Sequence, residues 1–198
     1  MTSTPKTPSE MSVKFFKSQK DWATWLNKHH AKSSGVWLQI AKKTSRLESV
    51  SYDEALEVAL CYGWIDGQKK ALDESAWLQR FTPRGPRSIW SKINREKAEA
   101  LIKSGRMRPA GLAAIDGAKQ TGQWAAAYDS QRTVGVPADL QSALDQNPKA
   151  KAFFASLDSA NRYAILFRLQ TAKKPETRAR RLEQFVTMLE SREKIHPQ

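Results

Sequence analysis

Apolar and polar residues alternate in three short stretches of the first 85 residues, and this pattern predicts β-strands. The segment GVWLQIAKK alternates most clearly, because Val36, Leu38 and Ile40 alternate with Trp37, Gln39 and Ala41. Residues 64–70 and 76–82 give two further stretches of the same kind, and Pro83 and Pro86 end the regular pattern after them. We therefore expect a sheet of about three strands in this half of the chain.

Two helices are expected in the same half of the chain, one before the first strand and one between the first two strands, because apolar residues recur there at helical spacing. The first covers residues 19–30, and the second covers residues 52–62. Ser51 and Glu54 have the spacing of a capping box at the start of the second helix. Gly63 follows it and can end it with a left-handed residue. Helices and strands are therefore mixed in the N-terminal half.

Helical spacing dominates the second half of the chain, with a loop over residues 129–137. Ser88 and Ser159 are expected to cap two of its helices. The expected helices cover residues 89–104, 109–121, 138–145, 160–171 and 175–191, with a further short one from Pro148. Strands followed by a run of helices indicate an α+β fold, in which a small N-terminal sheet with helices precedes a helical C-terminal half. We expect a disordered tail over residues 1–12, an α+β core domain over 13–128 and a helical subdomain over 129–198.

Positive charge is concentrated in two parts of the chain. The 33 basic and 20 acidic residues give a net charge of +13. Residues 68–108 hold eleven basic and four acidic residues, a net charge of +7, and residues 162–198 hold nine and four, a net charge of +5. Such clustering favours a surface for phosphates or for an acidic protein, although basic helices are also often simply solvated.

Composition excludes several classes of protein. No run of 18 apolar residues is present, so no membrane span is expected, and the N-terminus lacks the apolar segment of a secretory signal. Cys61 is the single cysteine, which fits a reducing cytoplasm. His29 and His30 are adjacent on a helix and point in different directions, so we expect no metal site. No nucleotide-binding glycine loop is present, and no cofactor is expected.

Several motifs resemble one protein family over about residues 15–192. They are SYDEALEVALCYGWIDGQ (51–68), QRFTPRGPRSIWSKIN (79–94), GRMRPAGLAAID (105–116) and AKKPETRARR (172–181), with WATWL and GVWLQIAKK before them. Together they are similar to the YdeI/OmpD-associated family, also called the bacteriocin-protection family. The resemblance implies an envelope-related or bacteriocin-related role. It assigns no catalytic residues and leaves the biochemical activity undefined.

The segment from Trp64 to Asn94 is the strongest candidate for a site. If its two strands pair, Asp66 and Arg80 are expected to converge on a pocket. Arg84 and Arg87 lie on a proline-flanked loop before an expected helix start, which favours an anion. The residues that we expect to bind an anionic ligand are Trp64, Asp66, Gln68, Arg80, Thr82, Arg84, Arg87, Ser88, Trp90 and Asn94. The alternative is a structural Asp66–Arg80 ion pair with the other arginines solvated.

A second basic patch lies near the C-terminus and consists of Lys173, Lys174, Arg178, Arg180 and Arg181. Three hypotheses follow for the function. The first is a cytoplasmic binding protein whose basic groove, from Arg80 to Arg108, holds nucleic acid or another polyanion. The second is a bacteriocin-tolerance or stress-tolerance protein that binds an acidic protein partner. The third is an enzyme or small-anion pocket around Asp66 and Arg80. No catalytic constellation is recognisable, so we favour the first two.

Overall fold

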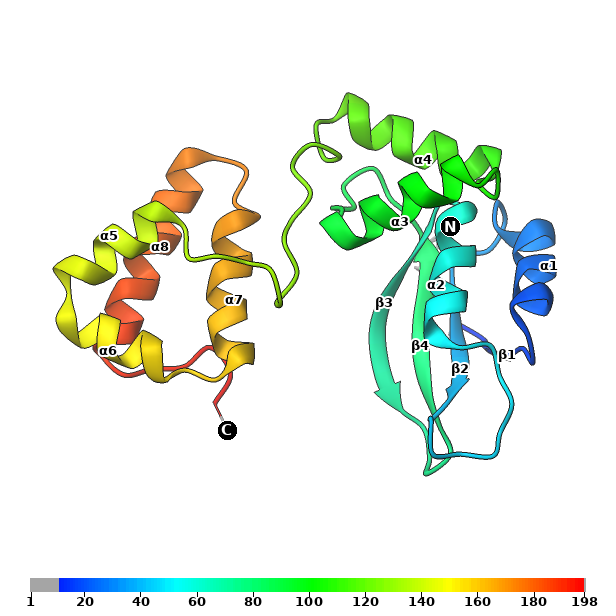
Figure 1. Cartoon of the computed structure of the whole chain (residues 1–198), viewed down its shortest axis with the longest axis horizontal. Helices are drawn as coiled ribbons and strands as arrows, with labels where there is room; N and C mark the ends of the chain where they lie inside the picture. The colour runs from blue at the N-terminus through cyan, green and yellow to red at the C-terminus, as the bar shows by residue number, and fades with distance from the viewer. Residues whose placement is uncertain (1–10, 198) are drawn as a thin grey trace, which may run out of the picture. The chain divides into compact units, whose positions relative to one another are not determined.

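The computed structural model describes residues 11–197, and the chain folds into two compact units (Figure 1). The N-terminal unit holds the chain up to Trp90 and Asn94–Ala126, and the C-terminal unit holds Ser91–Ile93 and the chain from Ala127 on. A sheet with helices in the first unit and helices alone in the second confirm the α+β fold class. The expected tail over residues 1–12 falls almost entirely outside the described residues. No described helix combines the length and the apolar character that a membrane crossing requires.

The sheet has four strands in the order β1-β2-β4-β3. They are β1 (Val13–Phe15), β2 (Val36–Ala41), β3 (Trp64–Ala71) and β4 (Ala76–Pro83). β1 runs parallel to β2, and the other neighbours are antiparallel. The expected number of about three strands is therefore corrected to four. β1 was missed because three residues are too few to show an alternating pattern.

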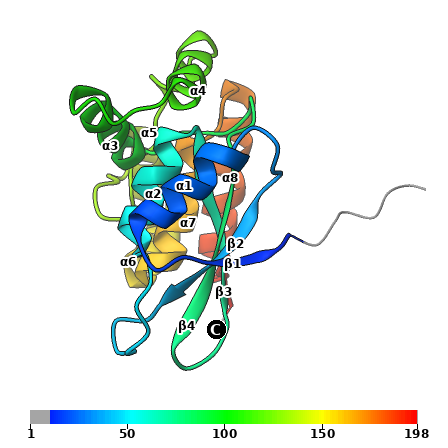
Figure 2. The ribbon, with the colours of Figure 1, turned by 90° about the vertical axis from the view of Figure 1, so that its right-hand side faces the viewer.

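Two helices, α1 (Gln19–His29) and α2 (Tyr52–Cys61), pack against one face of the sheet (Figure 2). Trp22 of α1 is completely buried, and its ring centroid lies 5.7 Å from that of Phe81 on β4. The Trp22 indole N–H donates to the Ala55 carbonyl of α2 at 3.1 Å, so the buried polar atom is satisfied. We call the covered side the helix face and the other side the open face.

Both ends of α2 follow the sequence signals. The Ser51 side chain accepts from the Glu54 amide, and the Glu54 carboxylate accepts from the Ser51 amide at 2.9 Å, which completes the capping box. These bonds to Ser51 hold the pKa of Glu54 below its usual value. Gly63 has a φ of +70°, the left-handed conformation that allows the chain to turn directly from α2 into β3.

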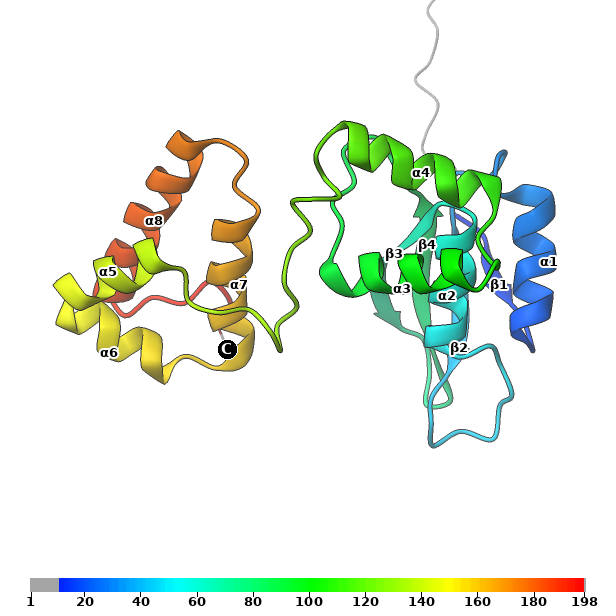
Figure 3. The ribbon, with the colours of Figure 1, turned by 45° about the horizontal axis from the view of Figure 1, so that its top comes forward.

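α3 (Lys92–Lys103), apart from its first two residues, and α4 (Pro109–Gln120) complete the N-terminal unit (Figure 3). The expected helix over 89–104 begins three residues late. Ser88 is not its cap, because the Ser88 hydroxyl accepts from the Gly85 amide at 3.0 Å and closes the preceding turn instead. α4 begins at Pro109 as expected, since proline needs no hydrogen-bond acceptor in a first turn.

The C-terminal unit packs its helices around a core of its own. The helices are α5 (Ala138–Gln146), α6 (Pro148–Ser156), α7 (Ser159–Gln170) and α8 (Pro175–Glu190). Leu140, Ile165, Leu169 and Leu189 are all completely buried in this core. The cap of α7 is Asp158 rather than the expected Ser159, because its carboxylate accepts from the Asn161 amide at 2.8 Å.

An ion pair between Asp139 and Arg178 joins α5 to α8 and leads to a prediction on stability. The Arg178 guanidinium donates from Nε at 2.7 Å and from Nη2 at 2.9 Å to the two carboxylate oxygens, and from Nη1 to the Leu169 carbonyl at 2.7 Å. The bonds from Arg178 hold the pKa of Asp139 below its ordinary value. The pair therefore stabilises the unit above the unfolded-state pKa, and this contribution is lost as the pH falls through the folded-state pKa.

We expect Asp139→Asn to lower the free energy of unfolding of the C-terminal unit by about 1 kcal/mol at neutral pH, as for a partly exposed pair. All seven tryptophans lie in the N-terminal unit, so tryptophan fluorescence reports on that unit and circular dichroism on both. The variant should shift part of the dichroism transition and leave the fluorescence transition in place. The loss of unfolding free energy caused by Asp139→Asn should become smaller at acidic pH. An equal loss at all pH values would contradict the role of the carboxylate.

Candidate functional site

The two charged residues expected to converge, Asp66 and Arg80, lie on opposite faces of the sheet. Asp66 is paired with Phe81 in the strand register and therefore faces the helices. There it accepts a hydrogen bond from the Tyr52 hydroxyl of α2 at 2.8 Å. Arg80 is paired with Trp37 and faces the open side. The structure therefore contains neither the expected Asp66–Arg80 pocket nor the alternative ion pair between them.

A bulge in β3 interrupts the alternation of faces after Asp66. Trp64 and Asp66 are in register with Pro83 and Phe81 and share the helix face, as expected. The register shifts between Asp66 and Lys69, so the alternation does not continue to Gln68. The Gln79 side-chain amide bridges the bulge by donating to the Gly67 carbonyl at 2.9 Å. Trp64 is almost completely buried in the core, with its indole N–H donated to the His30 carbonyl, and Gln68 is exposed.

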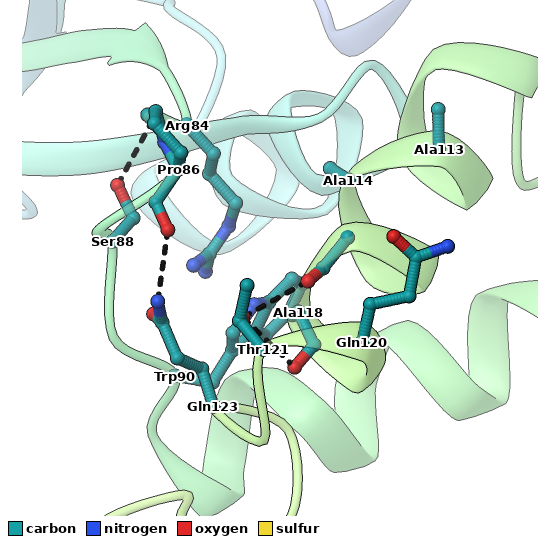
Figure 4. A pocket seen from close by; sticks show the side chains of 12 residues that line it. Arg84, Pro86, Ser88, Trp90, Ala113, Ala114, Ala118, Gln120, Thr121 and Gln123 are labelled. Atoms are coloured by element: carbon teal, nitrogen blue, oxygen red, sulfur yellow. Dashed lines mark hydrogen bonds between the residues drawn. The ribbon is translucent and has the colours of Figure 1, made fainter.

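Three of the ten expected residues, Arg84, Ser88 and Trp90, line a pocket of about 280 Å³ in the N-terminal unit (Figure 4). We call it the Arg84 pocket. The Arg84 guanidinium lies over the Trp90 ring, with Cζ 3.4 Å from the ring centroid, and donates to the Ile89 carbonyl at 3.3 Å. The remaining wall comes from the end of α4 and the residues after it, mainly small side chains with Gln120, Thr121 and Gln123.

The chemistry of the Arg84 pocket is mostly uncharged. Among residues 11–197, Arg84 is the one charged residue in its lining, and Gln123 is fixed by donating to the Pro86 carbonyl at 2.8 Å. The side-chain oxygen of Gln123 is buried and has no partner among the described residues. Of the other expected residues, Arg87 is exposed in the loop, Thr82 lies partly buried on β4, and Asn94 lies in the first turns of α3.

The open face of the sheet brings together aromatic and basic side chains that sequence reasoning treated separately. Trp37 and Gln39 of β2 face this side, and Val36, Leu38 and Ile40 face the helices. Phe15 of β1 is paired with Gln39 and is 37% exposed. Lys70 of β3 also lies on this face, in register with Leu78. Asp66 is the only carboxylate in the described strands, and it faces the helices.

Trp37, Lys70 and Arg80 form the centre of the open face. The Lys70 ammonium nitrogen lies 4.5 Å from the Trp37 ring centroid, and Arg80 is the direct cross-strand neighbour of Trp37. The Arg80 side chain runs past Gly67, since a Cβ on that glycine would lie 3.8 Å from both Cβ and Cδ of Arg80. Within the described residues, neither Lys70 nor Arg80 forms an ion pair. The face therefore carries two cations and a partly exposed indole ring.

Part of the remaining positive charge in residues 68–108 is already engaged in ion pairs. The ion pairs with one member in this segment are Lys92–Asp129 at 2.8 Å, Lys97–Asp53 at 3.5 Å and Arg106–Glu57 at 2.9 Å. The second basic patch is also partly engaged, because Arg178 binds Asp139 and Arg181 donates to the Arg168 carbonyl at 2.6 Å. Cationic residues of both segments thus also serve to hold the fold together.

No group of three or more metal-ligating side chains is found within residues 11–197. Cys61 is a free thiol on the buried side of α2, and burial raises its pKa above the ordinary value. The raised pKa keeps the thiol protonated at neutral pH.

Comparison with family models divides the chain into two matched segments. Residues 14–114 match a domain of unknown function, DUF8412, and residues 133–192 match the family described as "Bacteriocin-protection, YdeI or OmpD-Associated". The chain belongs to the DUF8412 family and carries a YdeI/OmpD-associated segment. The resemblance to the YdeI/OmpD-associated family is thereby confirmed over the C-terminal segment. Comparison with curated proteins and with solved structures gives no match.

The two matches fall in different structural units. The DUF8412 segment, which contains the motifs at 51–68 and 79–94, lies in the part of the chain that forms the sheet and α1 to α3. The YdeI/OmpD-associated segment contains α5 to α8 and the motif AKKPETRARR. The open face and the Arg84 pocket therefore lie in the N-terminal unit, outside the YdeI/OmpD-associated match.

Proposed function

We propose that the N-terminal unit binds single-stranded nucleic acid on the open face of its sheet. The observation that supports this most is that Trp37, Arg80 and Lys70, from three neighbouring strands, lie together on a face where no strand carboxylate points. An aromatic ring accepts a base by stacking, and flanking cations contact the backbone phosphates. This keeps the hypothesis of a polyanion-binding protein and relocates its surface from a groove between Arg80 and Arg108 to the sheet.

The energies of the two contacts at Trp37 favour an incoming base over Lys70. A cation over an exposed aromatic ring contributes about 0.5–1 kcal/mol. A base stacked on such a ring contributes about 1–3 kcal/mol by alanine substitution. Lys70 has a long flexible side chain, so its ammonium group can leave the ring and follow a phosphate while the base takes its place. Stacking and phosphate contact are then gained together.

A sheet face of this kind distinguishes single strands from duplexes. In a duplex, each base is stacked between its neighbours and paired, so a partly buried indole on a strand cannot reach its flat face. In a single strand, the bases can turn away from the backbone and lie against Trp37 and Phe15. A surface that contacted only the phosphates would bind single strands and duplexes alike. Strand preference is therefore the property that separates stacking on the sheet from general attraction to positive charge.

The test is fluorescence anisotropy with a labelled oligothymidine and a labelled duplex of equal length. We expect the single strand to bind more tightly than the duplex. Because two cations face the ligand, the logarithm of the affinity should fall with the logarithm of salt concentration with a slope of roughly −1.4. That slope corresponds to a loss of about sevenfold over a fourfold rise in salt. Equal binding of duplex and single strand, or no binding at low salt, would contradict the proposal.

A further inference from the structure

A second cationic site lies on the helix side of the N-terminal unit. A pocket of about 250 Å³ is bounded by the start of α1, the end of α2 and the segment before α4. Three cations line it: Lys20 from α1, and Arg106 and Arg108 from the segment before α4. No acidic residue among the described ones lines it. We call it the Cys61 pocket, because Cys61 and Val58 form part of its apolar lining.

The cations of the Cys61 pocket are only partly neutralised. Arg106 donates from Nη1 to the Glu57 carboxylate at 2.9 Å, and both side chains remain partly exposed. Lys20 and Arg108 form no ion pair within the described residues. Burial raises the pKa of Cys61, and the positive charges of Arg106 and Arg108 partly oppose this rise, as expected for two arginines close to the thiol. With Glu57 counted, two positive charges face the cavity.

We propose that the Cys61 pocket binds a phosphate monoester. Such a group carries a charge of about −1.5 to −2 at pH 7, which matches the excess of positive charge in the pocket. Arg108 presents a planar fork that can donate two parallel hydrogen bonds to phosphate oxygens, and Lys20 adds a mobile point charge. Val58, Ala23 and Cys61 can contact the organic group that carries the phosphate, and the volume limits that group to a small one.

The phosphate monoester can come from two sources. It is either a free small molecule or the terminal phosphate of a nucleic acid strand, and the chemistry at Lys20 and Arg108 is the same for both. The site does not depend on the open face, because its lining residues belong to α1, to α2 and to the segment before α4. The two proposals can therefore fail separately.

The test is an NMR titration of the full chain with inorganic phosphate at constant ionic strength, with chloride as the competing anion. We expect saturable shifts of the amides around Lys20 and Arg108. Arg108→Gln should raise the dissociation constant by at least about tenfold, the effect of one charge-assisted hydrogen bond. Lys43→Gln is the matched control, because Lys43 is exposed and lies outside the pocket. Shifts without saturation, or an equal weakening by both variants, would overturn the proposal.

A second titration separates the two sources. An oligonucleotide with a 5′-phosphate is compared with one that ends in a 5′-hydroxyl. Tighter binding of the phosphorylated strand, lost in Arg108→Gln, would assign the pocket to a strand end. Equal binding of both strands, together with saturable binding of inorganic phosphate, would assign it to a free monoester. Trp37→Ala should leave the phosphate titration unchanged, so a failure of the sheet proposal remains distinct from a failure of this one.

Discussion

Replacing Trp37 with alanine should weaken the binding of a single-stranded oligonucleotide by about 5-fold to 150-fold, the equivalent of about 1–3 kcal/mol for one stacked base. The indole is partly exposed and lies on the face of the sheet that points away from α1 and α2, so the fold should tolerate the change. Trp37→Phe keeps an aromatic surface and should recover most of the lost affinity. Anisotropy with labelled oligothymidine measures both effects.

A pair of lysine variants separates the effect of charge on the open face from the effect of net charge. Lys70→Ala removes a cation from the open face, and Lys28→Ala removes one from the exposed side of α1, in the helix layer. We expect Lys70→Ala to weaken binding and to reduce the salt slope by about 0.7, the value for one phosphate of a single strand. Lys28→Ala should change neither quantity by a comparable amount. If both lysine variants had the same effect, binding would reflect net charge rather than this face.

Gly111→Ala should destabilise the N-terminal unit by about 2 kcal/mol. Gly111 is buried where α4 crosses the end of α2, and a Cβ there would lie 2.5 Å from the Cys61 carbonyl oxygen and 2.8 Å from that of Leu60. It would also overlap the sulfur of Met107. Overpacking of a core costs up to about 3 kcal/mol. The better helix propensity of alanine returns about 1 kcal/mol of that. Tryptophan fluorescence during urea unfolding measures the change in this unit.

Gly117 of the same helix provides the matched control. No atom lies within 4 Å of a Cβ placed at this position, and the residue is exposed. Gly117→Ala should therefore stabilise the unit by about 0.5–1 kcal/mol through lower backbone entropy in the unfolded chain. We therefore expect the two alanine substitutions in α4 to change the free energy of unfolding in opposite directions. Destabilisation by both would mean that α4 tolerates no added side chain, irrespective of its contact with α2.

The elements of the N-terminal half were predictable wherever local chemistry determines them. The start of α2 is determined by the capping box of Ser51 and Glu54, and its end by the glycine that follows it. These signals lie within or beside the helix, so they can be recognised in the sequence. The start of α3 was not predictable in the same way. Ser88 has the right side chain for a cap, but a tight turn with Gly85 uses its hydroxyl, and only the folded loop reveals that competition.

The candidate site was harder to predict because it depends on strand register. Strand alternation correctly separates Trp37 from Val36 and Leu38. It cannot show that Arg80 pairs with Trp37, or that a bulge after Asp66 brings Lys70 onto the same face. Those relations join residues far apart in sequence, and one extra residue in a strand reverses the face of all residues after it. Arg80 was therefore expected beside a carboxylate that lies on the other side of the sheet.

The central claim is that a nucleic acid strand lies across the open face, and an NMR titration of the full chain with unlabelled oligothymidine tests it most directly. The Trp37 indole N–H and the amides of Phe15, Lys70 and Arg80 should shift and saturate together. The indole signals of the buried Trp22 and Trp64 should move little. Shifts confined to α8 and its basic residues, with the Trp37 signal unchanged at saturation, would contradict the account.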